Sequence, residues 1–256
     1  MKYSFLKYTV LAVLLVSCSQ DNDVVLSPAT ITLEFSHTWN GEVVTEADFN
    51  NLTYSNENGE LLSIERLRYL ISEITATAQD GTVISLGAYN LVDVTTGTGL
   101  LYELPQTLNP GTYTLSCMFG FSANNNIDGA YPDLNTASWN VPMGLGGGYH
   151  FMQLDGKFLD ATSTATNYNY HTIRAVDAAD PNNLVFQETA FEIPLGTLTI
   201  ADDQLVVVEM NIAAWFKSPH TWNLNEQHSM LMPNFDAQVR MAENGQDVFS
   251  YIVAME

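Results

Sequence analysis

The chain has 256 residues, of which 46% are hydrophobic, and it carries 29 Asp and Glu against 8 Lys and Arg for a formal net charge of −21. A surface this acidic repels nucleic acid and anionic lipid, which argues against a nucleic-acid-binding protein. The length after the first residues favours one large all-β domain over two small domains.

Residues 1–17 have the pattern of a bacterial lipoprotein signal peptide. Lys2 and Lys7 precede a short apolar run that is too short to span a bilayer as a mature helix. The run ends at Leu15-Val16-Ser17-Cys18, which resembles a lipobox, and the SQDND that follows resembles the signal that sends Bacteroidetes-type lipoproteins to the cell surface. We therefore expect Cys18 to be lipidated, in an outer-membrane lipoprotein at the cell surface or on the periplasmic face. Lipidation would leave Cys117 without an intrachain disulfide partner.

The next segments predict a tether over residues 18–28 and a single domain over 29–256. ATITLEFSHTWNG alternates, so that every second residue from Ile31 to Trp39, including His37, shares one face of a half-buried strand. Turn sequences at 79–81 and 109–111 separate further strands, and the strand after the second turn places Cys117 on its apolar face.

A long segment without periodicity, 122–148, interrupts the strands. A loop of this length in a compact domain is usually functional or packed on itself. Further strand patterns follow, and a single helix is predicted from a cap at Asn234 to a stop at Gly245. The fold expected from these elements is an all-β antiparallel β-sandwich with long loops and a short C-terminal helix.

Five histidines are present, and none of them lies in a short metal-binding motif. A hairpin turning in DATSTATN would place His150 and His171 opposite or nearly opposite each other, with Cβ atoms about 5 Å apart. Alternation groups His150 with Met152 and Leu154, and His171 with Ile173 and Ala175, on apolar faces. Neutral imidazoles in such surroundings suit Cu(I) or zinc. The predicted metal ligands are His37, His150 and His171.

Three other interpretations remain open at this stage. Histidines on apolar faces are often ordinary core residues. The tail PHTWNLNEQHSMLMP gathers His220, His228, Met230 and Met232, a second set of soft ligands for Cu(I). Residues 124–129 resemble the start of a calcium loop, but position 12 of that loop is Asn135 where a glutamate is needed, which favours a simple turn.

No catalytic signature is found, neither GxSxG nor a P-loop nor a dinucleotide fingerprint. We therefore predict a binding protein and not an enzyme. The alternative to metal binding is an accessory lipoprotein that binds a glycan or a partner protein through the 122–148 loop and its aromatic residues.

An ordered set of segments resembles the MbnP-like family, the methanobactin-associated periplasmic proteins. The segments are FSHTWNGEVV, NENGELLSIERLRYLISEI, AYNLVD, NPGTYTLSCMFGFSANNN, LNTASWNVPMGLGGGYHFMQLDGKF, NYNYHT, VVVEMNIAAWF and ENGQDVFSY. The resemblance implies a copper-binding β-sandwich that serves metal acquisition or storage. It also implies a site made of histidines and a tryptophan oxidised to kynurenine by a partner di-haem peroxidase of the cytochrome c peroxidase type.

The resemblance assigns this site to particular residues. His37 corresponds to the histidine of the family's first-strand F-x-H, and His171 to that of its aromatic-x-x-His strand. His150 follows the GGGY run and is a feature of the branch to which this chain is similar. Trp139 lies in the family's tryptophan-bearing loop. Many relatives have two tryptophans there, and this chain has one with a glycine insertion, so Trp39 competes as the oxidised residue.

Overall fold

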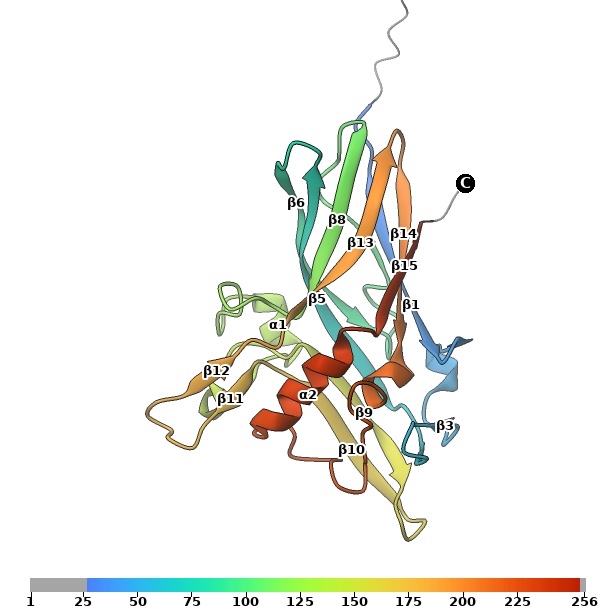
Figure 1. Ribbon diagram of the computed structural model, residues 1–256, viewed down its shortest axis with the longest axis vertical. Helices are drawn as coiled ribbons and strands as arrows, with labels where there is room; N and C mark the ends of the chain where they lie inside the picture. The colour runs from blue at the N-terminus through green and yellow to red at the C-terminus, as the bar shows by residue number, and fades with distance from the viewer. Residues whose placement is uncertain (1–26, 254–256) are drawn as a thin grey trace, which may run out of the picture.

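Two β-sheets face each other in the computed structural model, which describes residues 27–253 (Figure 1). The first sheet has the order β15 (Phe249–Val253), β14 (Gln204–Asn211), β1 (Ile31–Trp39) and β2 (Glu42–Val43), with β7 (Leu101–Glu103) also pairing with β1. Strands β1 and β14 run parallel, and the other pairings between described strands are antiparallel.

The second sheet is larger. Its order is β13 (Phe191–Ile200), β8 (Gly111–Phe119), β5 (Arg66–Ala78), β9 (Met152–Leu159), β4 (Leu61–Leu62) and β3 (Tyr54–Ser55). In addition, β6 (Val83–Asp93) pairs with β5, and β10 (Ala165–Thr172) pairs with β9. Strands β11 (Ala175–Asp177) and β12 (Val185–Gln187) form a separate hairpin. The predicted all-β antiparallel β-sandwich is confirmed, and β1 with β14 is the one parallel pair among the described strands.

The core lies between the two sheets and follows the alternation of the sequence. Ile31, Leu33 and Phe35 of β1 are buried, as are Leu115 and Cys117 of β8. Residues between them in the sequence point outward and are more exposed. Period-2 alternation in the sequence therefore does place one face of each of these strands in the core.

The helices are short. They are α1 (Pro132–Thr136) and α2 (Phe235–Gly245), together with the 3₁₀ helices η1 (Glu46–Asp48), η2 (Met143–Leu145) and η3 (Ile212–Phe216). The predicted cap of the C-terminal helix is confirmed, because the Asn234 side chain accepts a hydrogen bond from the backbone N–H of Ala237 at 3.0 Å. None of the helices in residues 27–253 combines the length and the apolar character needed to cross a bilayer.

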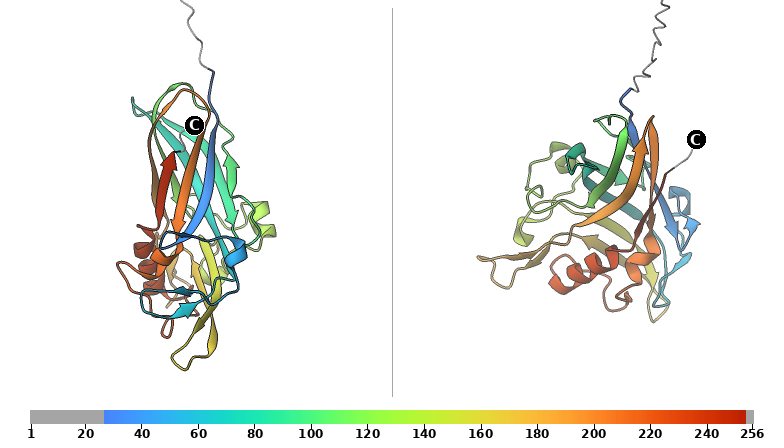
Figure 2. Two further views of the ribbon diagram at one scale, coloured as in Figure 1. Left: turned by 90° about the vertical axis from the view of Figure 1, so that its right-hand side faces the viewer. Right: turned by 45° about the horizontal axis from the view of Figure 1, so that its top comes forward.

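Strand β5 changes partner halfway along one of its edges. Its first residues, Arg66–Tyr69, pair with β9, and its later residues from Ile71 pair with β8. The long loop between β8 and β9 leaves and re-enters the sheet at this point. Both views in Figure 2 show the segment around α1 projecting from the side of the strands. The partner change therefore determines where the ends of the loop lie.

Candidate metal centre

Leu70 ties both ends of the long loop to the middle of β5. Its backbone N–H donates to the carbonyl of Phe151 at 2.9 Å, and its own carbonyl accepts from Gly120 N–H at 2.9 Å. Gly120 has φ +79, and a Cβ atom there would lie 2.4 Å from the Phe151 ring, so this position requires glycine. The backbone next to His150 is thus held at a fixed point of the sheet.

The loop is packed on itself through its polar side chains. The Asn126 side-chain oxygen accepts from Tyr149 N–H at 2.8 Å, and Asp128 accepts from Gly148 N–H at 3.1 Å. The Tyr149 hydroxyl donates to Asn135 at 2.8 Å. Oxygen atoms that a calcium loop would direct at the ion are used here to fix the loop end, which agrees with the interpretation as a turn.

His150 is buried and makes two side-chain contacts of different kinds. Its Nδ1 lies 2.9 Å from the Trp139 carbonyl oxygen, and its Nε2 lies 3.2 Å from the sulfur of Met232. Burial is the main cause that lowers the pKa of His150, to about 4. The ring is therefore neutral at neutral pH, and a neutral imidazole has one N–H and one lone pair.

The contacts of His150 determine which nitrogen carries the proton. A carbonyl oxygen only accepts hydrogen bonds, so the proton belongs on Nδ1, where it is donated to Trp139. Nε2 then carries a lone pair directed at the Met232 thioether, which has no hydrogen to donate. Two soft electron-pair donors face each other 3.2 Å apart without a proton between them. A soft cation such as Cu(I) would turn this contact into an attractive one.

His171 lies beside His150, with ring centroids 5.5 Å apart and planes at 84°. Its Nε2 is 2.8 Å from Asp155, which also accepts from Arg66 at 2.6 Å and Asn169 at 2.5 Å. Burial opposes ionisation of Asp155, but these hydrogen bonds outweigh it and lower the pKa of Asp155 to about 2. An ionised carboxylate accepts a hydrogen bond from Nε2–H, which leaves Nδ1 as the nitrogen of His171 that can carry a lone pair.

The two histidines meet by a different route from the predicted one. His171 pairs with Gln153 in the β9–β10 ladder, and His150 precedes β9 and is held by the backbone of Trp139. The predicted apolar face of His171 is wrong. In β10 the core face is formed by Tyr168, Tyr170 and Thr172, and His171 lies on the opposite face. The alternation breaks after β10, where the Ile173 N–H donates to the side chain of a residue in α2.

Solvent reaches this centre through a pocket of about 530 Å³. The pocket is lined by residues from the 122–148 loop, β10 and the segment before α2: Leu145, Asn169, His171, Met230, Leu231, Met232 and Pro233. Met230 is 77% exposed, whereas Met232 contacts His150. A small ion can therefore approach His171 and Met232 from outside.

Trp139 borders the same centre. Its side chain is fully buried, its ring centroid is 5.7 Å from that of His150, and the Arg68 guanidinium lies 4.9 Å from its centroid. The indole N–H has no hydrogen-bond partner among residues 27–253. The structure thus brings together three of the predicted site residues: Trp139, His150 and His171.

His37 and Trp39 lie elsewhere. His37 is buried in the sandwich interior, where its Nε2 is 3.0 Å from the Tyr69 hydroxyl. Tyr69 and Arg68 are neighbours in β5, so their side chains point to opposite faces of the sheet, and Arg68 is the residue that lies over Trp139. Desolvation lowers the pKa of His37 to about 4. Trp39 stacks on Tyr54 at 4.8 Å. Nowhere in residues 27–253 do three or more His, Cys, Asp or Glu side chains gather to hold a metal, so the predicted three-histidine set is not assembled.

The tail cluster is divided between several places. His220 pairs with Glu243, and His228 lies against Phe158 with its Nδ1 3.0 Å from the Leu224 carbonyl. Met232 of that cluster contacts the predicted ligand His150. The sequence analysis assigned Met232 to the alternative tail site, where the MLMP sequence marks it as a soft ligand. It did not identify Asp155. Cys18 lies outside the described residues.

The chain is similar to known proteins in its sequence pattern and in its fold. The family model for MbnP matches residues 28–233. The fold is similar to that of the solved structure of MbnP from Methylosinus trichosporium, with a TM-score of 0.54 and 10% sequence identity over 90% of this chain and 100% of that chain. At this identity the structural similarity supports the fold alone. No curated protein matches the sequence.

Proposed function

Because the chain belongs to the MbnP family, we propose that it binds copper as Cu(I), for metal acquisition or storage and without catalytic turnover. The observation that carries the proposal is the contact between His150 Nε2 and the Met232 sulfur. Both atoms offer electron pairs, and both are soft donors of the kind that Cu(I) prefers over hard cations.

The ligands that we assign are His150 Nε2, the Met232 sulfur and His171 Nδ1. The Trp139 carbonyl keeps the proton of His150 on Nδ1, and the Asp155 carboxylate keeps the proton of His171 on Nε2. Carboxylate or carbonyl partners behind ligating histidines are the usual means of orienting them. The donor set therefore fits a soft monovalent ion better than calcium or magnesium, which prefer oxygen ligands.

Competitive titration with a Cu(I) chelator tests the proposal. We expect one high-affinity site in the wild type, and its loss in the His150→Ala, His171→Ala double variant. His220→Ala is the matched control, since this histidine pairs with Glu243 away from the centre. A His37→Gln variant distinguishes the assigned ligands, His150, His171 and Met232, from the set predicted from the sequence, which includes His37. We expect this variant to keep the Cu(I) affinity of the wild type. Equal Cu(I) uptake by the wild type and the double variant would remove the site.

Trp139 is our candidate for oxidation to kynurenine by a partner di-haem peroxidase. Its support is the 5.7 Å separation between the rings of Trp139 and His150, whereas Trp39 is stacked on Tyr54 in the core. Peptide mass spectrometry after co-expression with the peroxidase checks this assignment. We expect the kynurenine mass on the Trp139 peptide, and modification of Trp39 alone would contradict the assignment.

We further propose that Cys18 anchors the protein by lipid to the outer membrane, at the surface or the periplasmic face. The lipobox-like LVSC and the acidic residues after it support this location. Cell fractionation of wild type and Cys18→Ser gives a direct test. We expect the wild type in the membrane fraction and the variant outside it.

A further inference from the structure

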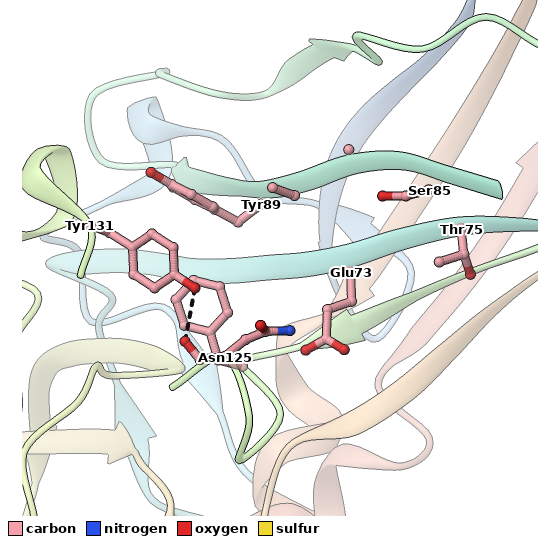
Figure 3. Close-up of a pocket in the computed structure, with 9 residues that line it drawn as sticks. Glu73, Thr75, Ser85, Tyr89, Asn125 and Tyr131 are labelled. Carbon is pink, nitrogen blue, oxygen red and sulfur yellow. Dashed lines mark hydrogen bonds between the residues drawn. The ribbon is translucent and has the colours of Figure 1, made fainter. Parts of the chain in front are cut away.

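A second pocket, of about 320 Å³, lies between the long loop and strands β5 and β6 (Figure 3). Its lining includes Glu73 of β5, Asn125 of the loop and the rings of Tyr89, Phe121 and Tyr131. None of these residues belongs to the ligand set of the metal centre. The chemistry of this pocket is determined by one carboxylate and three aromatic rings.

Glu73 is placed at the pocket by an irregularity of β5. The register of β5 shifts against β8 between Ser72 and Thr75, and Glu73 itself has φ +49. Left-handed backbone at a residue that is not glycine is uncommon and costs energy, and bulges of this kind often redirect a side chain towards a site. Here the bulge directs the carboxylate towards the pocket, beside Asn125 (Figure 3).

The carboxylate of Glu73 is negatively charged and has no cationic partner. Its Oε1 accepts from Ser122 N–H at 3.0 Å. Burial opposes ionisation, but hydrogen bonds from the Ser122 and Asn125 side chains and from the Ser122 backbone lower the pKa of Glu73 overall. No Lys, Arg or His lines the pocket, and no ion pair among the described residues involves Glu73. A cation is the missing complement to this charge.

The aromatic residues present rings and not hydroxyl groups. The Tyr89 hydroxyl donates to Asp133 at 2.6 Å, and the Tyr131 hydroxyl donates to the Asn125 carbonyl at 2.9 Å (Figure 3). Both polar ends are therefore already used. The rings pack together, with centroids 4.6 Å apart for Phe121 and Tyr131 and 4.9 Å apart for Tyr89 and Tyr131. Ring faces attract cations.

We propose that this pocket binds a primary alkylammonium group, the chemistry shared by a lysine side chain and a small free amine. The nitrogen lies against the Glu73 carboxylate, and its alkyl chain lies along the rings of Tyr89 and Tyr131. The strongly acidic surface raises the local concentration of cations and assists their approach.

The test uses NMR of the full-length lipoprotein in detergent micelles, with ¹³C-labelled tyrosine and phenylalanine, titrated with n-butylammonium chloride. We expect saturable shifts of the Tyr89, Tyr131 and Phe121 ring signals. Neutral n-butanol, of similar shape, is expected to leave these signals in place. Glu73→Gln keeps the shape of the side chain and removes its charge, so we expect the affinity for butylammonium to fall at least tenfold. Glu192→Gln, an exposed acid outside the pocket, is the matched control.

Several outcomes would overturn the proposal. These are equal shifts with n-butanol, unchanged binding in Glu73→Gln, or shifts with methyl glucoside but none with butylammonium. A second titration with Nα-acetyl-lysine-N-methylamide distinguishes the sources of the ammonium group. Tighter binding of this peptide-like probe than of butylammonium assigns the pocket to a lysine of a partner protein, and weaker binding assigns it to a free amine. The copper-site double variant is expected to bind butylammonium normally.

Discussion

At the scale of single residues, the carboxylate of Asp155 positions His171, one of the proposed copper ligands. Asp155→Asn would remove the charge that holds the His171 proton on Nε2. We expect Cu(I) affinity to fall about 10–100-fold, the usual effect of losing a partner behind a metal ligand.

Arg66→Gln is the control for Asp155→Asn. It removes the ion pair to Asp155 and leaves the hydrogen bond to His171 in place. Its side chain is 41% exposed, so its loss should change stability and affinity little. Chelator competition measures both variants. Equal affinities in Asp155→Asn and the wild type would show that His171 needs no such support.

His37 makes the stability of the protein depend on pH. Burial lowers its pKa from 6.5 to about 4 in the folded state, so between these values the unfolded chain binds a proton that the folded chain does not. Stability therefore rises as pH increases from about 4 to 6.5, with a contribution of roughly 3 kcal/mol from this one residue.

Urea unfolding across that pH range measures the contribution of His37. His37→Gln keeps an acceptor for the Tyr69 hydroxyl and does not titrate. We expect its unfolding free energy to depend less steeply on pH than that of the wild type. Parallel pH profiles for the two proteins would show that His37 is not buried as a neutral ring.

At the scale of elements, the turn at Gly120 connects the sheet to the metal centre. Gly120→Ala places a methyl group 2.4 Å from the Phe151 ring and also forces alanine into left-handed backbone. We expect a loss of about 1–2 kcal/mol from the backbone and about 1–3 kcal/mol from the displaced ring. Because Phe151 follows His150 directly, Cu(I) affinity should fall as well.

Gly129→Ala separates these two effects of the Gly120 substitution. Gly129 has φ +72 and no atom within 4 Å of an added Cβ, so it carries the backbone cost alone. Chemical denaturation and Cu(I) titration of the two variants are the measurements. If Gly120→Ala lowered stability and Cu(I) affinity no more than Gly129→Ala, the position of the loop end would not determine the geometry of the metal centre.

Local sequence signals predicted the elements better than the contacts between them. Alternation identified the buried face of the strand that contains His37, and Asn234 identified the start of the last helix. The sheet edge that each strand joins depends on pairing between distant segments. The change of partner at Leu70 therefore could not be predicted from the residues around it. The approach of Met232 to His150 also depends on how the segment before α2 packs against the sheet. A one-residue difference in alternation was enough to assign His171 to the wrong face.

At the scale of the whole molecule, copper binding should stabilise the fold. The proposed ligands come from the end of the long loop, from β10 and from the segment before α2, so the ion would connect parts that are distant in sequence. At free Cu(I) a hundredfold above the dissociation constant, binding to the folded state alone adds about 2.7 kcal/mol. For a domain of this size, that corresponds to a rise in Tm of about 5–10 °C.

Thermal unfolding with and without Cu(I), under reducing conditions, measures this stabilisation. The His150→Ala, His171→Ala double variant is the reference, because it lacks the proposed site and keeps the remaining surface. We expect its Tm to be insensitive to Cu(I). An equal rise in both proteins would assign the stabilisation to binding elsewhere on the acidic surface.

Copper K-edge X-ray absorption spectroscopy identifies the atoms bound to copper, so it checks whether Cu(I) lies between a histidine nitrogen and the Met232 sulfur. We expect nitrogen and sulfur neighbours of copper in the singly loaded wild type. The sulfur is expected to be lost in Met232→Leu and retained in Met230→Leu, a methionine at the mouth of the same pocket. A copper environment without sulfur in the wild type, or with sulfur unchanged in Met232→Leu, would show that the ion is not bound by Met232.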